Sequence, residues 1–122
     1  MNGKSGTITP EEFDTLAALY DSYGGKVLAS KVALVCSKKA EVLKHEYPSS
    51  SVAAAYASVG NKIKTAVGTS TTKIGRDAFS ALSSLVNTYG AEVITMKLAK
   101  LAKRNEATAD FTTLKSIFPR SA

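Results

Sequence analysis

The 122-residue sequence contains no tryptophan, one cysteine, one histidine and three prolines. The single cysteine, Cys36, excludes an internal disulfide framework and is compatible with a reducing compartment. Its apolar neighbours Val32 and Val35 predict a core position for the thiol. Because His45 has neither a second histidine nor a second cysteine with which to share a metal ion, no metal site or cofactor is expected. The sequence therefore predicts no enzyme.

Long apolar runs are absent as well. Nowhere do about 18 uncharged apolar residues follow one another, which is the length that a membrane span requires. The N-terminal segment also lacks an apolar stretch after Lys4, so no secretion signal is expected. The polar segment 68–75, GTSTTKIG, does not have the spacing of a nucleotide-binding phosphate loop. We therefore expect an intracellular protein with no membrane partner and no small-molecule substrate.

Positive charge is concentrated in the second half of the chain. Residues 1–61 contain six lysines and six acidic residues, whereas residues 62–122 contain ten lysines or arginines and four acidic residues. The formal net charge of +6 therefore belongs entirely to the second half. A basic half favours a polyanionic partner such as nucleic acid or an acidic membrane surface, and a solvated lysine-rich face is the alternative interpretation.

Composition and apolar periodicity predict an all-α fold. Thr9, Pro10 and Glu12 form a typical helix start, with a cap, a first-turn proline and a capping-box glutamate. The spacing of apolar residues predicts two long helices, over 10–39 and 76–105. Shorter helical segments are expected over 52–59, 62–67 and 110–118, separated by a loop before Val52, a break at 60–61 and the polar loop 68–75. Asp110 is expected to cap the last helix and Pro119 to stop it.

The two long helices are related by an internal repeat. A shift of 66 residues aligns the segment from Phe13 to Ala33 with the segment from Phe79 to Ala99 and gives eight identities. The identical pairs are Phe13/Phe79, Leu16/Leu82, Leu19/Leu85, Tyr23/Tyr89, Gly24/Gly90, Val27/Val93, Lys31/Lys97 and Ala33/Ala99. Because glycine inside a helix destabilises it, we expect Gly24 and Gly90 to allow a close helix crossing. A tolerated glycine or a helix break is the alternative.

The second half resembles a histone fold. Its residues 62–118, KIKTAVGTSTTKIGRDAFSALSSLVNTYGAEVITMKLAKLAKRNEATADFTTLKSIF, are similar to archaeal histones and to histone type two-A. The first half, ITPEEFDTLAALYDSYGGKVLASKVALVCSKKAEVL followed by SSSVAAAYASV, resembles a partner histone that lacks its first helix. Together they resemble the truncated histone doublets of some large DNA viruses.

This resemblance implies a pseudo-dimer in which two long central helices cross antiparallel, flanked by short helices. It divides the chain into a flexible N-terminus (1–8), a first histone-like half (9–60), a second half (61–118) and a C-terminal tail (119–122). The implied function is DNA binding and compaction without sequence specificity, since no array suited to base readout is visible. The implied partners are double-stranded DNA and other histone or histone-doublet copies, which meet through the apolar last helix near Leu114 to Phe118. The implied location is the nucleoid, nucleus or virion.

In histone pairs, paired loops bind phosphates through backbone amides, hydroxyls and nearby cations. One implied loop pair joins residues 69–73 and Arg76 to Lys38, Lys39, Lys44 and His45. The other joins Lys4, Thr7 and Thr9 to Lys103, Arg104, Asn105 and Thr108, and a central patch uses Lys62 and Lys64. The implied DNA-binding residues are Lys38, Lys39, Lys44, Lys62, Lys64, Thr71, Thr72, Lys73, Arg76, Lys103, Arg104 and Thr108. Arg76 is the favoured minor-groove or phosphate contact.

Three other interpretations remain open. One is a histone-fold module that binds another protein, for which exposed apolar residues such as Phe118 would matter most. Another is a helical subunit of a nucleoprotein filament, such as the small subunit of a CRISPR effector or a viral RNA-coating protein. The third is a helical bundle of another role. A preference for duplex DNA over single-stranded RNA would separate the DNA-binding histone-like protein from the filament subunit.

Overall fold

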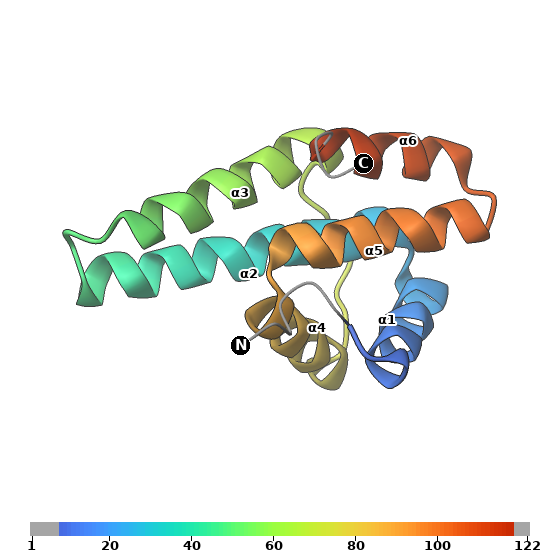
Figure 1. Ribbon diagram of the computed structural model, residues 1–122, viewed down its shortest axis with the longest axis horizontal. Coiled ribbons are helices and arrows are strands. Elements are labelled where there is room, and N and C mark those ends of the chain that lie inside the picture. Colours follow the sequence, from blue (N-terminus) through green and yellow to red (C-terminus); the bar gives the residue numbers. More distant parts are fainter. Residues whose placement is uncertain (1–7, 119–122) are drawn as a thin grey trace.

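Six α-helices make up most of residues 8–118, the part of the chain that the computed structural model describes (Figure 1). The helices are α1 (Pro10–Tyr23), α2 (Gly25–Glu46), α3 (Ser51–Val67), α4 (Arg76–Tyr89), α5 (Ala91–Arg104) and α6 (Thr108–Ile117). Residues 8–118 contain no strand, so the predicted all-α class is confirmed. Within this range no helix is long and apolar enough to cross a membrane. Most of the predicted N-terminal segment, and Pro119 with the predicted tail, lie outside the described residues.

The internal repeat of the sequence is also a repeat of structure. Helix α1 spans Pro10–Tyr23 and α4 spans Arg76–Tyr89, so both ends of the two helices are 66 residues apart. In each half a single glycine follows, and the next helix begins at Gly25 or Ala91, again with the same offset. Each half is therefore a helix, a glycine, a second helix, a loop and a third helix.

The predicted long helices 10–39 and 76–105 are wrong, because each is broken at its glycine. Gly24 has φ 87° and ψ 161°, and Gly90 has φ 99° and ψ 151°. Residues with a side chain rarely adopt this conformation. A Cβ added at either glycine would have no atom within 4 Å, so neither one enables a close helix crossing. The two glycines turn the chain between helices instead.

Close helix packing does depend on a glycine, but at Gly60. Helix α3 continues through residues 60–61, where a break was predicted, and the predicted boundary between the halves falls inside this helix. A Cβ added at Gly60 would lie 3.1 Å from Cys36 Cβ and 3.2 Å from the backbone oxygen of Ala33. Gly60 therefore lets α3 approach α2. The predicted core position of Cys36 is confirmed, since its side chain is fully buried.

Side-chain caps mark the start of two helices, α1 and α3. Thr9 and Glu12 form the predicted capping box of α1. Ser50 accepts a hydrogen bond from the backbone N–H of Val52 and caps α3. The predicted cap at Asp110 is wrong, because α6 already begins at Thr108. Asp110 lies in the first turn instead, where a carboxylate is favourable beside the positive end of the helix dipole.

Both halves contribute to one core. In Figure 1, α2 and α5 run side by side in opposite directions, α3 returns along α2, and α6 returns along α5. Helices α1 and α4 contact each other and lie together on one side of these four helices. Repeat-related positions are buried alike, as in the fully buried pairs Leu16/Leu82 and Leu28/Ile94. The halves are therefore not separate domains.

The repeated tyrosines connect the halves reciprocally. The hydroxyl of Tyr23 accepts a hydrogen bond from the backbone N–H of Gly75, just before α4 (3.3 Å). The hydroxyl of Tyr89 donates to the carboxylate of Glu12, in the first turn of α1. This hydrogen bond is the main reason why the pKa of Tyr89 is raised above its usual value. Each tyrosine thus fixes the start of the other half's first helix.

The apolar end of α6 belongs to this shared core. Leu114 is fully buried, and Ile117 and Phe118 are 4% and 6% exposed. The prediction that this segment forms a contact between copies, or a partner surface through Phe118, is therefore wrong. Burying these side chains within the chain leaves little apolar surface on α6 for a partner.

Candidate nucleic-acid interface

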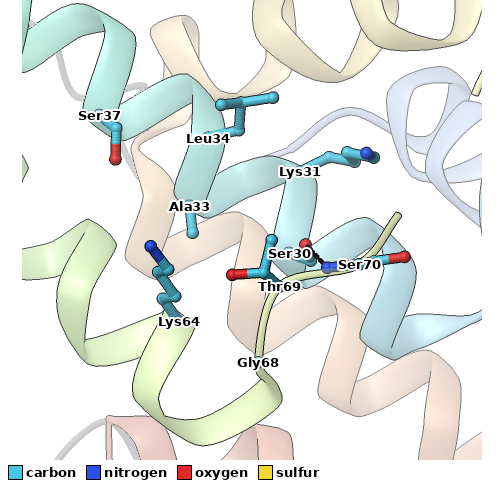
Figure 2. Close-up of a pocket in the computed structure, with 9 residues that line it drawn as sticks. All are labelled: Ser30, Lys31, Ala33, Leu34, Ser37, Lys64, Gly68, Thr69 and Ser70. Atoms are coloured by element: carbon cyan, nitrogen blue, oxygen red, sulfur yellow. Dashed lines mark hydrogen bonds between the residues drawn. The ribbon is translucent and has the colours of Figure 1, made fainter. Parts of the chain in front are cut away.

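A small groove lies where the loop between α3 and α4 folds back onto α2 (Figure 2). The backbone N–H of Ser70 donates a 3.0 Å hydrogen bond to the hydroxyl of Ser30, and this bond ties the loop to α2. The hydroxyl of Ser70 in turn accepts from the backbone N–H of Thr72 (3.1 Å) and orders the next residues. The groove has a volume of about 100 Å³. Its lining residues are Ser30, Lys31, Ala33, Leu34, Ser37, Lys64, Gly68, Thr69 and Ser70.

Two lysines border this groove from opposite sides. Figure 2 shows Lys31 on α2 and Lys64 in the last turn of α3, with the loop between them and their ammonium groups pointing away from each other. Neither lysine forms an ion pair with a carboxylate of residues 8–118. Hydroxyl groups of Ser37, Thr69 and Ser70 line the same groove. Cations together with hydroxyl donors are the groups that proteins use to bind phosphate oxygens.

The size and charge of the groove limit what it can hold. Pockets for organic ligands usually have volumes of about 300–1,000 Å³. At about 100 Å³ the groove is too small for such a molecule. A single anionic group attached to a larger molecule outside the groove fits this volume.

The predicted central patch is divided by the geometry of α3. Lys62 and Lys64 are two residues apart on one helix, so their side chains point about 200° apart around its axis. Lys64 lines the groove, whereas the ammonium group of Lys62 lies 5.5 Å from the centre of the Phe118 ring. Of the predicted pair, only Lys64 joins the groove.

The rest of the predicted loop leads away from the groove to α4. Thr71, Thr72 and Lys73 are exposed, and so is Arg76 at the first position of α4. These residues continue the polar, basic surface along the same loop. Their side chains have no hydrogen-bond partner in residues 8–118 that would occupy them.

The first predicted loop pair is formed only in part. Ser70 fixes the loop beside Ser30, and Lys44 follows fourteen residues later on α2, about 21 Å along the helix. Lys44 and His45 therefore lie at the far end of α2, away from the loop. Lys38 is closer, because its ammonium group lies 5.9 Å from the centre of the Phe79 ring, one turn after Arg76.

Lys39 is held in a different contact. Its ammonium group donates to the side-chain oxygen of Asn87 on α4 (3.3 Å) and lies 6.0 Å from the centre of the Tyr56 ring on α3. These two contacts tie α2 to its neighbours. Lys39 therefore has a packing role that the sequence did not predict.

The second predicted loop pair lies at the end of α5, where cations rest on aromatic rings. Lys100 and Arg104 are 5.9 and 5.6 Å from the centre of the Phe13 ring. Lys103 is 5.7 Å from the centre of the Phe111 ring. Cation–π contacts of this kind hold a charge at the surface without neutralising it.

Acidic groups reduce the attraction of this end for a polyanion. Asp14 and Asp21 line a hollow together with Arg104 and Asn105. Thr108 is exposed at the start of α6, but Thr9 is occupied in the capping box of α1. The other expected members, Lys4 and Thr7, lie outside the described residues. The groove beside α2 is therefore the better candidate for a phosphate contact.

Sequence reasoning missed the α2 side of the groove, which includes Ser30 and Lys31. Lys31 carried a signal, because it is one of the eight identities of the repeat. Ser30 carried none, since its role depends on a contact with Ser70, forty residues later. Lys31 and Ser30 both come from a half of the chain that has no excess of positive charge.

The described residues offer little for covalent or metal chemistry. Burial raises the pKa of the Cys36 thiol to about 11, so the reactive thiolate is scarce at neutral pH. Within residues 8–118 no group of three or more histidine, cysteine, aspartate or glutamate side chains is arranged to hold a metal ion. His45 is exposed near the far end of α2.

Comparisons with known proteins leave the family open. No protein-family model matches the chain, and neither a curated protein nor a solved structure is significantly similar to it. The surface chemistry of the chain therefore has to carry the functional argument.

Proposed function

We propose that this protein binds double-stranded DNA through the phosphate backbone, without base readout and without chemistry. The observation that carries the proposal is the groove in which Lys31 and Lys64 flank the hydroxyls of Thr69 and Ser70. A phosphate group is small, anionic and attached to a larger polymer, as the groove requires. The excess of positive charge in residues 62–122 supports long-range attraction to such a polymer.

In this proposal Lys31 and Lys64 each contact one phosphate at the groove, and the loop guides the neighbouring ones. Thr71, Thr72, Lys73 and Arg76 extend from the groove toward α4 and contact the next phosphates or the minor groove. Lys38 approaches the same strand from α2, since its ammonium group lies beside the ring of Phe79, one turn after Arg76. Contacts of this type position DNA but carry no sequence information.

The finer form of the proposal treats the halves as two fused histone-like units that compact DNA, as the sequence resemblance implies. The structural repeat and the shared core support it. In place of the continuous central helix of a histone, each half has two helices joined at a glycine. The finer proposal therefore concerns the pairing of the halves, and the binding of phosphate does not depend on it.

Competition binding tests the choice of nucleic acid. Fluorescence anisotropy is measured with the full chain and a labelled duplex at low salt, and unlabelled competitors are then added. We expect duplexes of unrelated sequence to compete within about threefold of one another, because phosphate contacts are the same in all sequences. Single-stranded RNA is expected to compete at least tenfold more weakly. Preference for single-stranded RNA would support the filament subunit instead, and one strongly preferred duplex sequence would contradict backbone binding.

A further inference from the structure

The first half of the chain has an extension that the second half lacks. Helix α2 contains 22 residues and its counterpart α5 contains 14. The last residue of α5, Arg104, corresponds to Lys38 in the repeat, so the eight residues 39–46 have no counterpart. They add about 12 Å of helix. Together with the start of α3 they form the extension, residues 39–56, which projects beyond the other helices in Figure 1.

The apolar faces of α2 and α3 continue into the extension, where their side chains are exposed. On α2, Leu28, Val35 and Val42 share one face at a spacing of seven residues, and their exposed fractions are 0%, 7% and 54%. On α3, Ile63 is fully buried, whereas Val52 on the same face is 50% exposed. The two faces therefore remain apolar in the extension, but the helices that bury them in the core do not reach that far.

The uncovered face of α2 opens into a groove. This groove has a volume of about 370 Å³ and is bordered on the other side by α4. Val42 and Leu43 line it together with Lys39 and Glu46. With Lys38 the groove combines two cations, one carboxylate and apolar side chains. The apolar side chains and the carboxylate suit a protein surface better than a polyanion.

The extension carries no net charge, like the rest of the first half. Residues 39–56 contain two lysines and two glutamates, which cancel, although the whole chain carries +6. Because the excess positive charge lies in residues 62–122, two copies repel each other less at the extension than at the second half.

The charges on the uncovered face of α2 complement the charges on the same face of a second copy. Lys39 and Glu46 lie seven residues apart on the face that also carries Val42 and Leu43. If a second α2 helix packs antiparallel, centred between residues 42 and 43, Lys39 of each copy faces Glu46 of the other. The same alignment places Val42 against Leu43. Such a two-fold contact uses the same residues on both copies.

We propose that two copies of this chain associate through their extensions, with the α2 helices packed antiparallel about Val42 and Leu43. Each copy supplies the apolar cover that the other lacks, and two Lys39–Glu46 pairs fix the alignment. Asn87 uses one of the three N–H donors of the Lys39 ammonium group, which leaves two for Glu46 of the second copy. The inference does not depend on DNA binding and is tested without nucleic acid.

Sedimentation equilibrium of the full chain measures this association. We expect a monomer–dimer equilibrium with a dissociation constant on the order of 10–100 µM, as is typical of small interfaces. Val42→Asp is expected to weaken dimerisation at least tenfold, because it buries an unpaired charge in the contact. Glu46→Lys is expected to weaken it about tenfold, since it places lysines opposite one another. Circular dichroism checks that each variant keeps its helices.

A charge exchange provides the decisive comparison. Combining Lys39→Glu with Glu46→Lys reverses both partners and is expected to restore the dissociation constant to within about threefold of the original. Glu41→Lys changes the net charge by the same amount as Glu46→Lys but lies on another face of α2, so it is expected to leave dimerisation unchanged. A chain that remains monomeric at about 200 µM, which is above the expected dissociation constant, overturns the proposal. Equal effects of Glu41→Lys and Glu46→Lys overturn it as well.

Discussion

Replacing both lysines of the groove, Lys31→Ala with Lys64→Ala, is expected to lower the affinity for duplex DNA by roughly a hundredfold at about 0.1 M salt. Each lysine neutralises one phosphate, and each lost contact removes the release of condensed counterions that accompanies it. The slope of log affinity against log salt is therefore expected to become shallower by about two. Anisotropy titrations at several salt concentrations measure both quantities.

Lys97→Ala is the matched control for this experiment. Lys97 is the repeat counterpart of Lys31, but the loop 68–75 is hydrogen-bonded to α2 through Ser30, and Lys97 does not line the groove. The control changes the net charge as much as Lys31→Ala does, and we expect its affinity to stay within about threefold of the original. If Lys97→Ala and Lys31→Ala weaken binding equally, net charge rather than the groove determines affinity.

Replacing the two linking glycines, Gly24→Ala with Gly90→Ala, is expected to destabilise the fold by about 2–6 kcal/mol. Both positions have φ near +90° with extended ψ, a conformation that costs a residue with a side chain about 1–3 kcal/mol. A domain of this size is usually stable by about 5–15 kcal/mol, so the double variant loses a large part of its stability. Thermal and denaturant unfolding, followed by circular dichroism, measure the loss.

Gly75→Ala serves as the control for glycine removal. Gly75 has φ −62°, which any residue adopts, and an added Cβ would meet only the Tyr23 hydroxyl at 4.0 Å. We therefore expect a change in the free energy of unfolding below about 0.5 kcal/mol. If the Gly24 and Gly90 variants were as stable as the Gly75 variant, the helices would be able to run through both positions.

Signals that act within a few residues were sufficient to predict much of the fold. The cap at Thr9 and the polar loop 68–75 depend on neighbouring residues, and the structure contains both, together with the offset of the repeat. A helix break at Gly24 and Gly90 was only the alternative to a close helix crossing, because the apolar stripe continues in phase on both sides of each glycine. Periodicity alone does not distinguish a glycine inside a helix from one that joins two helices.

Features that depend on distant contacts were not predictable in the same way. Residues 60–61 look like a break in the sequence, yet Gly60 is where α3 packs against Cys36 of α2, and that contact keeps the helix continuous. The groove also depends on a contact between residues that are distant in the sequence. Lys64 and Thr69 were expected to bind phosphate, but Lys31 joins them only because Ser70 ties the loop to Ser30.

The salt dependence of duplex binding tests the central claim most directly. For about five neutralised phosphates, the slope of log affinity against log salt is expected to be about −4 to −5. The titration uses the full chain, one duplex and a series of monovalent salt concentrations. A slope near zero, or no binding at the lowest salt, would contradict binding of the phosphate backbone and leave the helical fold as described.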